Sequence, residues 1–106
     1  MEINFTIVDS ILKSWLKKYG LTVYTEYKDE AVRLIPVVDN QGTKFEISIE
    51  SMVDSNEFKI SAFSESVKSE AWKKIVNQNE LENALDETYK IIELWIENLG
   101  HKRNWF

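Results

Sequence analysis

The spacing of apolar residues changes twice along the chain, and this feature constrains the fold more than any other. In residues 6–19 apolar side chains recur every three or four positions, as on one face of an α-helix. From residue 21 to residue 63 they tend to alternate with polar ones, as in half-buried strands. The helical spacing then returns. This succession of helix, strands and helices predicts an α+β fold.

The first helix is predicted over residues 6–19, with Gly20 as its end. Glycine readily adopts the left-handed conformation in which many helices end. We expect the buried face of this helix to comprise Val8, Ile11, Leu12, Trp15, Leu16 and Tyr19.

Four strands are predicted between the helical segments, over residues 21–27, 31–38, 43–51 and 57–63. Pro36 lacks the backbone donor of a sheet hydrogen bond, so its strand is expected at an edge or at a bulge. The turn Asp39–Gly42 and a second turn at residues 54–56 make the connections short. Short connections predict an antiparallel meander.

Two helices are predicted after the last strand. Apolar residues between Val67 and Val76 have the spacing of a short amphipathic helix. Asn79 is expected to cap a longer helix, with Glu82 completing the capping box and Gly100 ending the helix. We expect its buried stripe to comprise Leu81, Leu85, Thr88, Ile92, Trp95 and Leu99.

The predicted fold is therefore a single α+β domain over residues 1–106, in the order α-β-β-β-β-α-α. The strands form a four-stranded antiparallel meander, and the helices pack on one of its faces. A basic and aromatic tail, residues 101–106, follows the last helix.

The composition argues against several classes of chemistry. The 106 residues include no cysteine and one histidine, His101. A catalytic zinc site usually needs several histidines, and a serine triad would depend on this terminal histidine. The three glycines form no dinucleotide-binding or phosphate-binding loop. We therefore expect a protein that is not an enzyme and that uses no metal or cofactor.

The distribution of apolar residues also argues against a membrane protein. No apolar run approaches the ~18 residues of a membrane span. The N-terminus lacks the basic and apolar regions of a signal peptide. A cytoplasmic protein without membrane contact is expected.

The predicted last helix has the densest charge. Between Asn79 and Leu99 it has six acidic residues and one basic residue, and its net charge of −5 equals that of the whole chain. Four of the acids share one stripe opposite the predicted core stripe, namely Glu82, Asp86, Glu93 and Glu97. Leu94 lies beyond this stripe, away from the core. The pattern predicts an acidic docking surface for a basic patch on a larger protein, or alternatively an ordinary solvated face.

Two other regions are candidates for partner contact. Glu46 and Glu50 lie on the predicted open face of the sheet, among charges of both signs that also suit a solvated face. In the tail the candidates are Arg103, Trp105 and Phe106, although these residues could equally fray or fold over the core. Basic residues are too dispersed to predict direct binding of nucleic acid.

The hairpin of residues 32–48, followed by an acidic helical C-terminal half, resembles small phage-encoded anti-CRISPR proteins that inhibit type II CRISPR nucleases. Some of those proteins occupy the DNA-binding cleft of the nuclease as DNA mimics. The resemblance implies that the acids of the last helix, or Glu46 and Glu50, meet arginines that otherwise contact DNA. The fourth strand, the milder negative charge and the basic tail depart from that pattern.

Three functions remain compatible with these features. We expect a non-enzymatic protein that binds and blocks a larger macromolecular partner, as anti-CRISPR and toxin-immunity proteins do. A small-molecule-binding domain would instead have a pocket between the sheet and Trp72 or Trp95. A homodimeric structural or chaperone-like module would pair edge strands.

Overall fold

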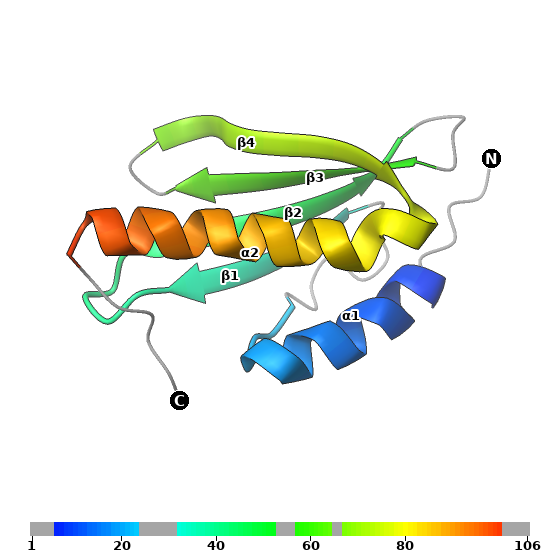
Figure 1. Cartoon of the computed structure of the whole chain (residues 1–106), viewed down its shortest axis with the longest axis horizontal. Helices are drawn as coiled ribbons and strands as arrows, with labels where there is room; N and C mark the ends of the chain where they lie inside the picture. The colour runs from blue at the N-terminus through cyan, green and yellow to red at the C-terminus, as the bar shows by residue number, and fades with distance from the viewer. Residues whose placement is uncertain (1–5, 24–31, 53–56, 65–66, 101–106) are drawn as a thin grey trace.

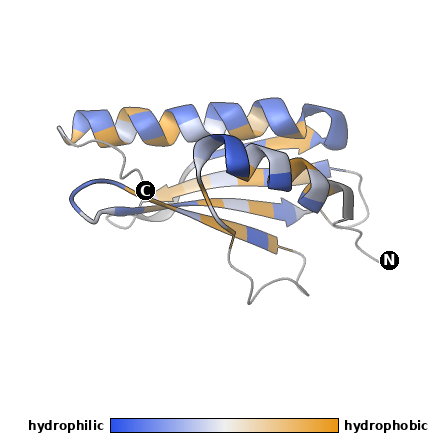
Figure 2. Cartoon of the chain, turned by 90° about the horizontal axis from the view of Figure 1, so that it is seen from below, coloured by the Kyte–Doolittle hydropathy of each residue, from blue (hydrophilic) through white to orange (hydrophobic). Residues whose placement is uncertain are grey.

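The computed structural model of the chain describes residues 6–23, 32–52, 57–64 and 67–100. Its elements are α1 (Thr6–Tyr19), β1 (Val32–Val38), β2 (Lys44–Ser51), β3 (Glu57–Ser64), β4 (Val67–Asn77), a 3₁₀ turn (Gln78–Glu80) and α2 (Leu81–Asn98). The strands form one antiparallel sheet in the order β1-β2-β3-β4 (Figure 1). Both helices lie on the same side of it (Figure 2). The predicted α+β class and the four-stranded meander are confirmed.

The segment predicted as a short third helix is instead β4, so the described residues contain two α-helices. Its second half pairs regularly with β3, from Trp72 opposite Ala62 to Asn77 opposite Glu57. The helix prediction was wrong because Lys74 fits the solvated face of a helix, whereas it interrupts the apolar alternation expected of a strand. In the strand, Lys74 shares the inward face with Trp72, and its ammonium group forms an ion pair with Glu87 on α2.

The strand predicted over residues 21–27 is not found in the part of it that the structure describes. Residues 21–23 form no strand, and residues 24–27 lie outside the described residues. Gly20 adopts a φ of 63°, and the Leu21 amide donates to the Leu16 carbonyl oxygen at 2.9 Å. This contact ends α1 where the sequence predicted. Leu21 and Val23 then pack against the margin of the core.

The core lies between the inward face of the sheet and the two helices. Its fully buried members include Ile35, Ile47, Ile49, Ile60, Ala62, Leu81, Leu85 and Ile92. On α2 the buried stripe also contains Tyr89 and Ile96, whereas Leu99 is 52% exposed. Leu99 was predicted in the core, but it caps the helix beyond Asn98. Tyr89, which was not predicted in the stripe, instead packs against α1, with its ring centroid 4.4 Å from that of Tyr19.

An ion pair between a buried arginine and a half-exposed aspartate joins β1 to α1. The Arg33 guanidinium donates to both carboxylate oxygens of Asp9, at 2.8 and 3.2 Å, and Arg33 is only 6% exposed. This contact helps to fix α1 against the sheet.

The start of α2 differs slightly from the prediction. The Asn77 side chain accepts a hydrogen bond from the Glu80 amide, and the Glu80 carboxylate accepts one from the Asn77 amide. This capping box lies two residues before the one predicted for Asn79 and Glu82. Glu82 is thereby left exposed and without a capping role.

Candidate functional site

The acidic residues in and just before α2 fall into two groups, and the difference defines the candidate site. Glu80, Asp86 and Glu87 bind groups within the chain. Glu82, Glu93 and Glu97 form no ion pair with any residue that the structure describes.

Asp86 is a structural contact between the two helices. Its Oδ1 accepts hydrogen bonds from Trp15 Nε1 at 2.9 Å and from the Tyr19 hydroxyl at 2.8 Å, and Lys18 Nζ lies 3.9 Å away. Burial alone would raise its pKa. The two hydrogen bonds and the charges of Lys18 and Lys90 outweigh that effect and lower the pKa of the carboxyl group.

Because its pKa is lowered in the folded chain, ionised Asp86 stabilises the fold. This contribution is complete above the unfolded-state pKa and is lost as the pH falls through the folded-state value. We expect Asp86→Asn to be less stable than the unmodified chain at neutral pH, and the difference to shrink on acidification below about pH 4. Urea denaturation across that range measures it. A difference that stays constant with pH would contradict the assignment.

Glu87 is neutralised on the other flank of α2. Its carboxylate oxygens lie 3.0 and 3.2 Å from the Lys74 Nζ on β4. This exposed pair joins the helix to the outer strand of the sheet, and it compensates one of the helix's negative charges.

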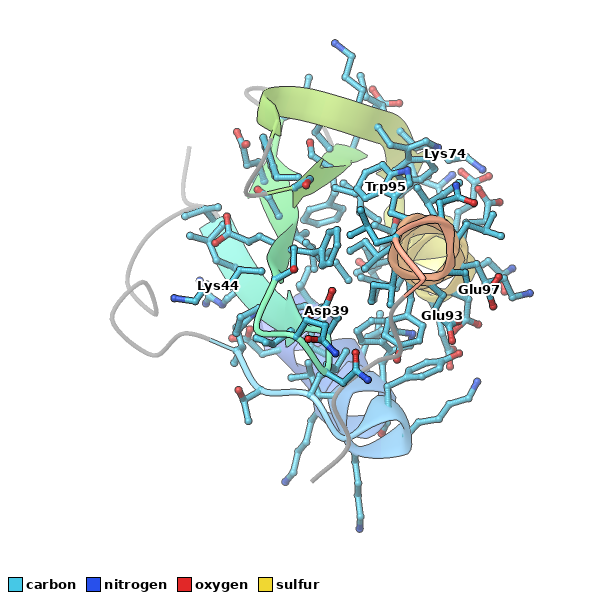
Figure 3. The ribbon with its side chains drawn as sticks, turned by 90° about the vertical axis from the view of Figure 1, so that its left-hand side faces the viewer. Asp39, Lys44, Lys74, Glu93, Trp95 and Glu97 are labelled. Carbon is cyan, nitrogen blue, oxygen red and sulfur yellow. The ribbon has the colours of Figure 1, made fainter. Side chains whose placement is uncertain are left out.

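The three remaining acids and a neighbouring leucine define what we call the outward face of α2, which consists of Glu82, Glu93, Leu94 and Glu97. Glu93 and Glu97 lie on the opposite side of the helix from Trp95, which points toward the sheet (Figure 3). Leu94 is 54% exposed although it is apolar. Three charges without a described partner beside an exposed leucine form a surface suited to protein contact.

Glu46 and Glu50 lie on the far side of the sheet from this surface. They alternate along β2 with the buried residues Phe45, Ile47 and Ile49, which face the helices. Lys44 extends from the same far side in Figure 3. The predicted contact residues on α2 and those on β2 therefore belong to two separate surfaces.

Burial raises the pKa of the Glu46 carboxyl group. Its neighbours across the sheet are Pro36 on β1 and Phe63 on β3, whose apolar side chains cannot donate hydrogen bonds to the carboxylate. A carboxylate in such surroundings lacks part of its hydration, which disfavours the charged form.

The structure also shows an apolar feature of β1 that the sequence analysis did not single out. Along β1, every residue on the face away from the helices is apolar, namely Val32, Leu34, Pro36 and Val38. Apart from Arg33, the strand is therefore apolar on both faces. The sequence already contains this nearly continuous apolar run, which is typical of strands covered on both faces.

Other predicted features fall outside what the structure describes or have no counterpart there. Arg103, Trp105 and Phe106 lie outside the described residues. The described ranges contain no group of three or more side chains arranged to hold a metal ion. No helix within them is long and apolar enough to cross a membrane.

Comparison with known proteins adds no family to this description. No protein family, no curated protein and no solved structure matches the chain.

Proposed function

We propose that this protein is a non-enzymatic interaction protein that binds and blocks a larger partner through the outward face of α2. The observation that supports this proposal is the partition of the acids. Asp86 and Glu87 are compensated within the chain, whereas Glu82, Glu93 and Glu97 have no ion pair with a described residue.

The chemistry of the outward face indicates the kind of partner. Uncompensated carboxylates attract a basic surface over distances of about 10 Å, and they orient it as it approaches. Leu94 would be covered once the partner is seated, which adds apolar contact at the margin of the charges. A basic nucleic-acid-binding cleft would complement this acidic face. The sequence resemblance names a type II CRISPR nuclease as the candidate.

A pocket for a small molecule is the weaker candidate. The space between the sheet and α2 contains fully buried side chains, including Ile47, Ile60, Leu85 and Ile92. Trp95 stacks near Phe45, with ring centroids 6.2 Å apart. Well-packed side chains leave little space for a ligand.

Affinity capture tests the proposed function. The protein is immobilised, and bacterial lysate containing a type II CRISPR nuclease is passed over it at low salt. We expect one stoichiometric partner that is released by added salt, because screening weakens contacts between exposed charges. A parallel column with the triple variant Glu82→Gln, Glu93→Gln and Glu97→Gln should retain much less of it.

The double variant Glu46→Gln and Glu50→Gln is the matched control, because it removes carboxylates from the other face. Thermal denaturation of both variants checks that they are folded. Equal retention by the triple variant and the unmodified protein would contradict the assignment to α2. An empty column under all conditions would contradict the proposed function.

A further inference from the structure

One cation lies among the residues of the outward face of α2. Lys90 is three residues before Glu93 and four residues before Leu94, so helical geometry places it about one turn from both, on the same side of the helix. It is the only basic residue of α2, and its side chain is exposed. A partner seated over Glu93 and Leu94 therefore covers the Lys90 ammonium group as well.

Lys90 forms no ion pair with any residue that the structure describes. Two acids lie about one turn before it, Asp86 and Glu87, and both bind other groups. Asp86 accepts two hydrogen bonds from α1, and Glu87 pairs with Lys74 on β4. Lys90 is the weakest of the groups that lower the pKa of Asp86. Its ammonium group can therefore accept a carboxylate from a partner without breaking a described contact.

This cation opposes the binding of a surface that is basic throughout. On such a surface a lysine or arginine would face Lys90, and like charges brought together in an interface cost free energy. The cost grows as the interface excludes the water that otherwise solvates both charges. Opposite a carboxylate, the same ammonium group would instead add an ion pair, and it would disfavour other basic surfaces.

We propose that Lys90 determines the specificity of the outward face of α2, and that the partner presents a carboxylate opposite it within an otherwise basic surface. The inference rests on the proposed function and names the charge pattern of its partner. Along α2 the charge is negative at Glu82, positive at Lys90, and negative at Glu93 and Glu97, over about 22 Å of helix. A matching partner has the opposite sign at each of these positions.

Three helical peptides that differ in one residue test this pattern. Each is about 18 residues long and has lysines three and seven residues to either side of a variable central position, as Glu93 and Glu97 are spaced from Lys90. Leucines four residues to either side correspond to Leu94. The central residue is glutamate, glutamine or lysine. NMR titration of the isotope-labelled, full-length protein measures each dissociation constant and locates each peptide by the amides whose shifts change.

The order of the three affinities distinguishes the charge pattern from a simply acidic face. We expect the glutamate peptide to bind about twofold to fivefold more tightly than the glutamine peptide, as for one exposed ion pair, and the lysine peptide to bind most weakly. The shifted amides should lie on α2. A face on which Lys90 has no role predicts the reverse order, because the lysine peptide has the highest positive charge. The reverse order would overturn the inference and leave the proposed function standing.

Charge reversal at Lys90 tests the same residue from the side of the protein. Lys90→Glu should invert the order of the peptides. In affinity capture it should also lower the retention of the partner, although it makes the face more acidic. Lys73→Glu is the matched control, because Lys73 is exposed on β4, faces away from the helices and has no ion pair with a described residue. It should change neither result, and thermal denaturation checks that both variants are folded.

The remaining outcomes also decide the question. Tighter retention of the partner by Lys90→Glu than by the unmodified protein would overturn the inference, because it would show a basic surface opposite this residue. Shifts outside α2, or no shifts with any peptide, would overturn it whatever the outcome of affinity capture. An empty column together with the expected order of peptides would support the role of Lys90 and contradict the proposed function.

Discussion

Replacement of Trp15 by alanine is expected to lower the free energy of unfolding by about 3–5 kcal/mol, the usual cost of removing a large aromatic side chain from a core. Trp15 is 1% exposed, and its ring lies 5.0 Å from that of Tyr19 and 6.1 Å from that of Tyr89. The substitution also removes a hydrogen bond to Asp86. Domains of this size are typically stable by about 5–15 kcal/mol, so the loss is a large fraction of the total. Urea denaturation followed by circular dichroism measures it.

Smaller changes keep the test informative if the alanine variant does not fold. Trp15→Phe retains most of the packing and loses the hydrogen bond, so a loss of about 1–3 kcal/mol is expected. Trp72→Phe is the matched control, because Trp72 is only partly buried and lies on an outer strand. A larger loss at Trp72 than at Trp15 would contradict the described packing of α1 against α2.

Replacement of Ile60 by alanine is expected to cost about 2–5 kcal/mol. Ile60 is fully buried on β3, on the face that packs against α2. Urea denaturation measures this change as well. The control variant replaces Ile75 on the neighbouring strand β4. Ile75→Ala should cost at most about 0.5 kcal/mol, because Ile75 is 49% exposed on the face away from the helices.

The comparison of Ile60 with Ile75 also distinguishes the strand from the helix first predicted there. In that helix Ile75 belonged to the apolar face and would have been buried. A large loss of stability at Ile75 would therefore contradict β4. A small loss at Ile75 with a large loss at Ile60 is the result that the described sheet requires.

Much of the fold could be predicted from local pattern alone. The helix over residues 6–19 and the turn Asp39–Gly42 were predicted because glycine, aspartate and periodic apolar residues determine them locally. β4 was missed because its apolar residues have helical spacing and Lys74 interrupts the alternation expected of a strand. What decides for the strand is the ladder with β3, which is a tertiary interaction that overrides local spacing.

The candidate site was predictable only in part. The position of Glu93, Leu94 and Glu97 on one exposed side of a helix follows from helical geometry. The role of Asp86 does not, since its hydrogen-bond partners Trp15 and Tyr19 are 71 and 67 residues away in the sequence. Helix periodicity placed all four acids on one stripe, but only the packing of α1 shows which of them is used within the fold.

The central claim is that the carboxylates left uncompensated on α2 bind a basic partner. The most direct measurement is the dissociation constant of the captured partner at several salt concentrations, by calorimetry, for the unmodified protein and for the triple glutamine variant at Glu82, Glu93 and Glu97. We predict that the variant binds about tenfold more weakly at low salt and that its affinity depends much less on salt. Equal affinities with equal salt dependence, in a variant shown to be folded, would contradict the account.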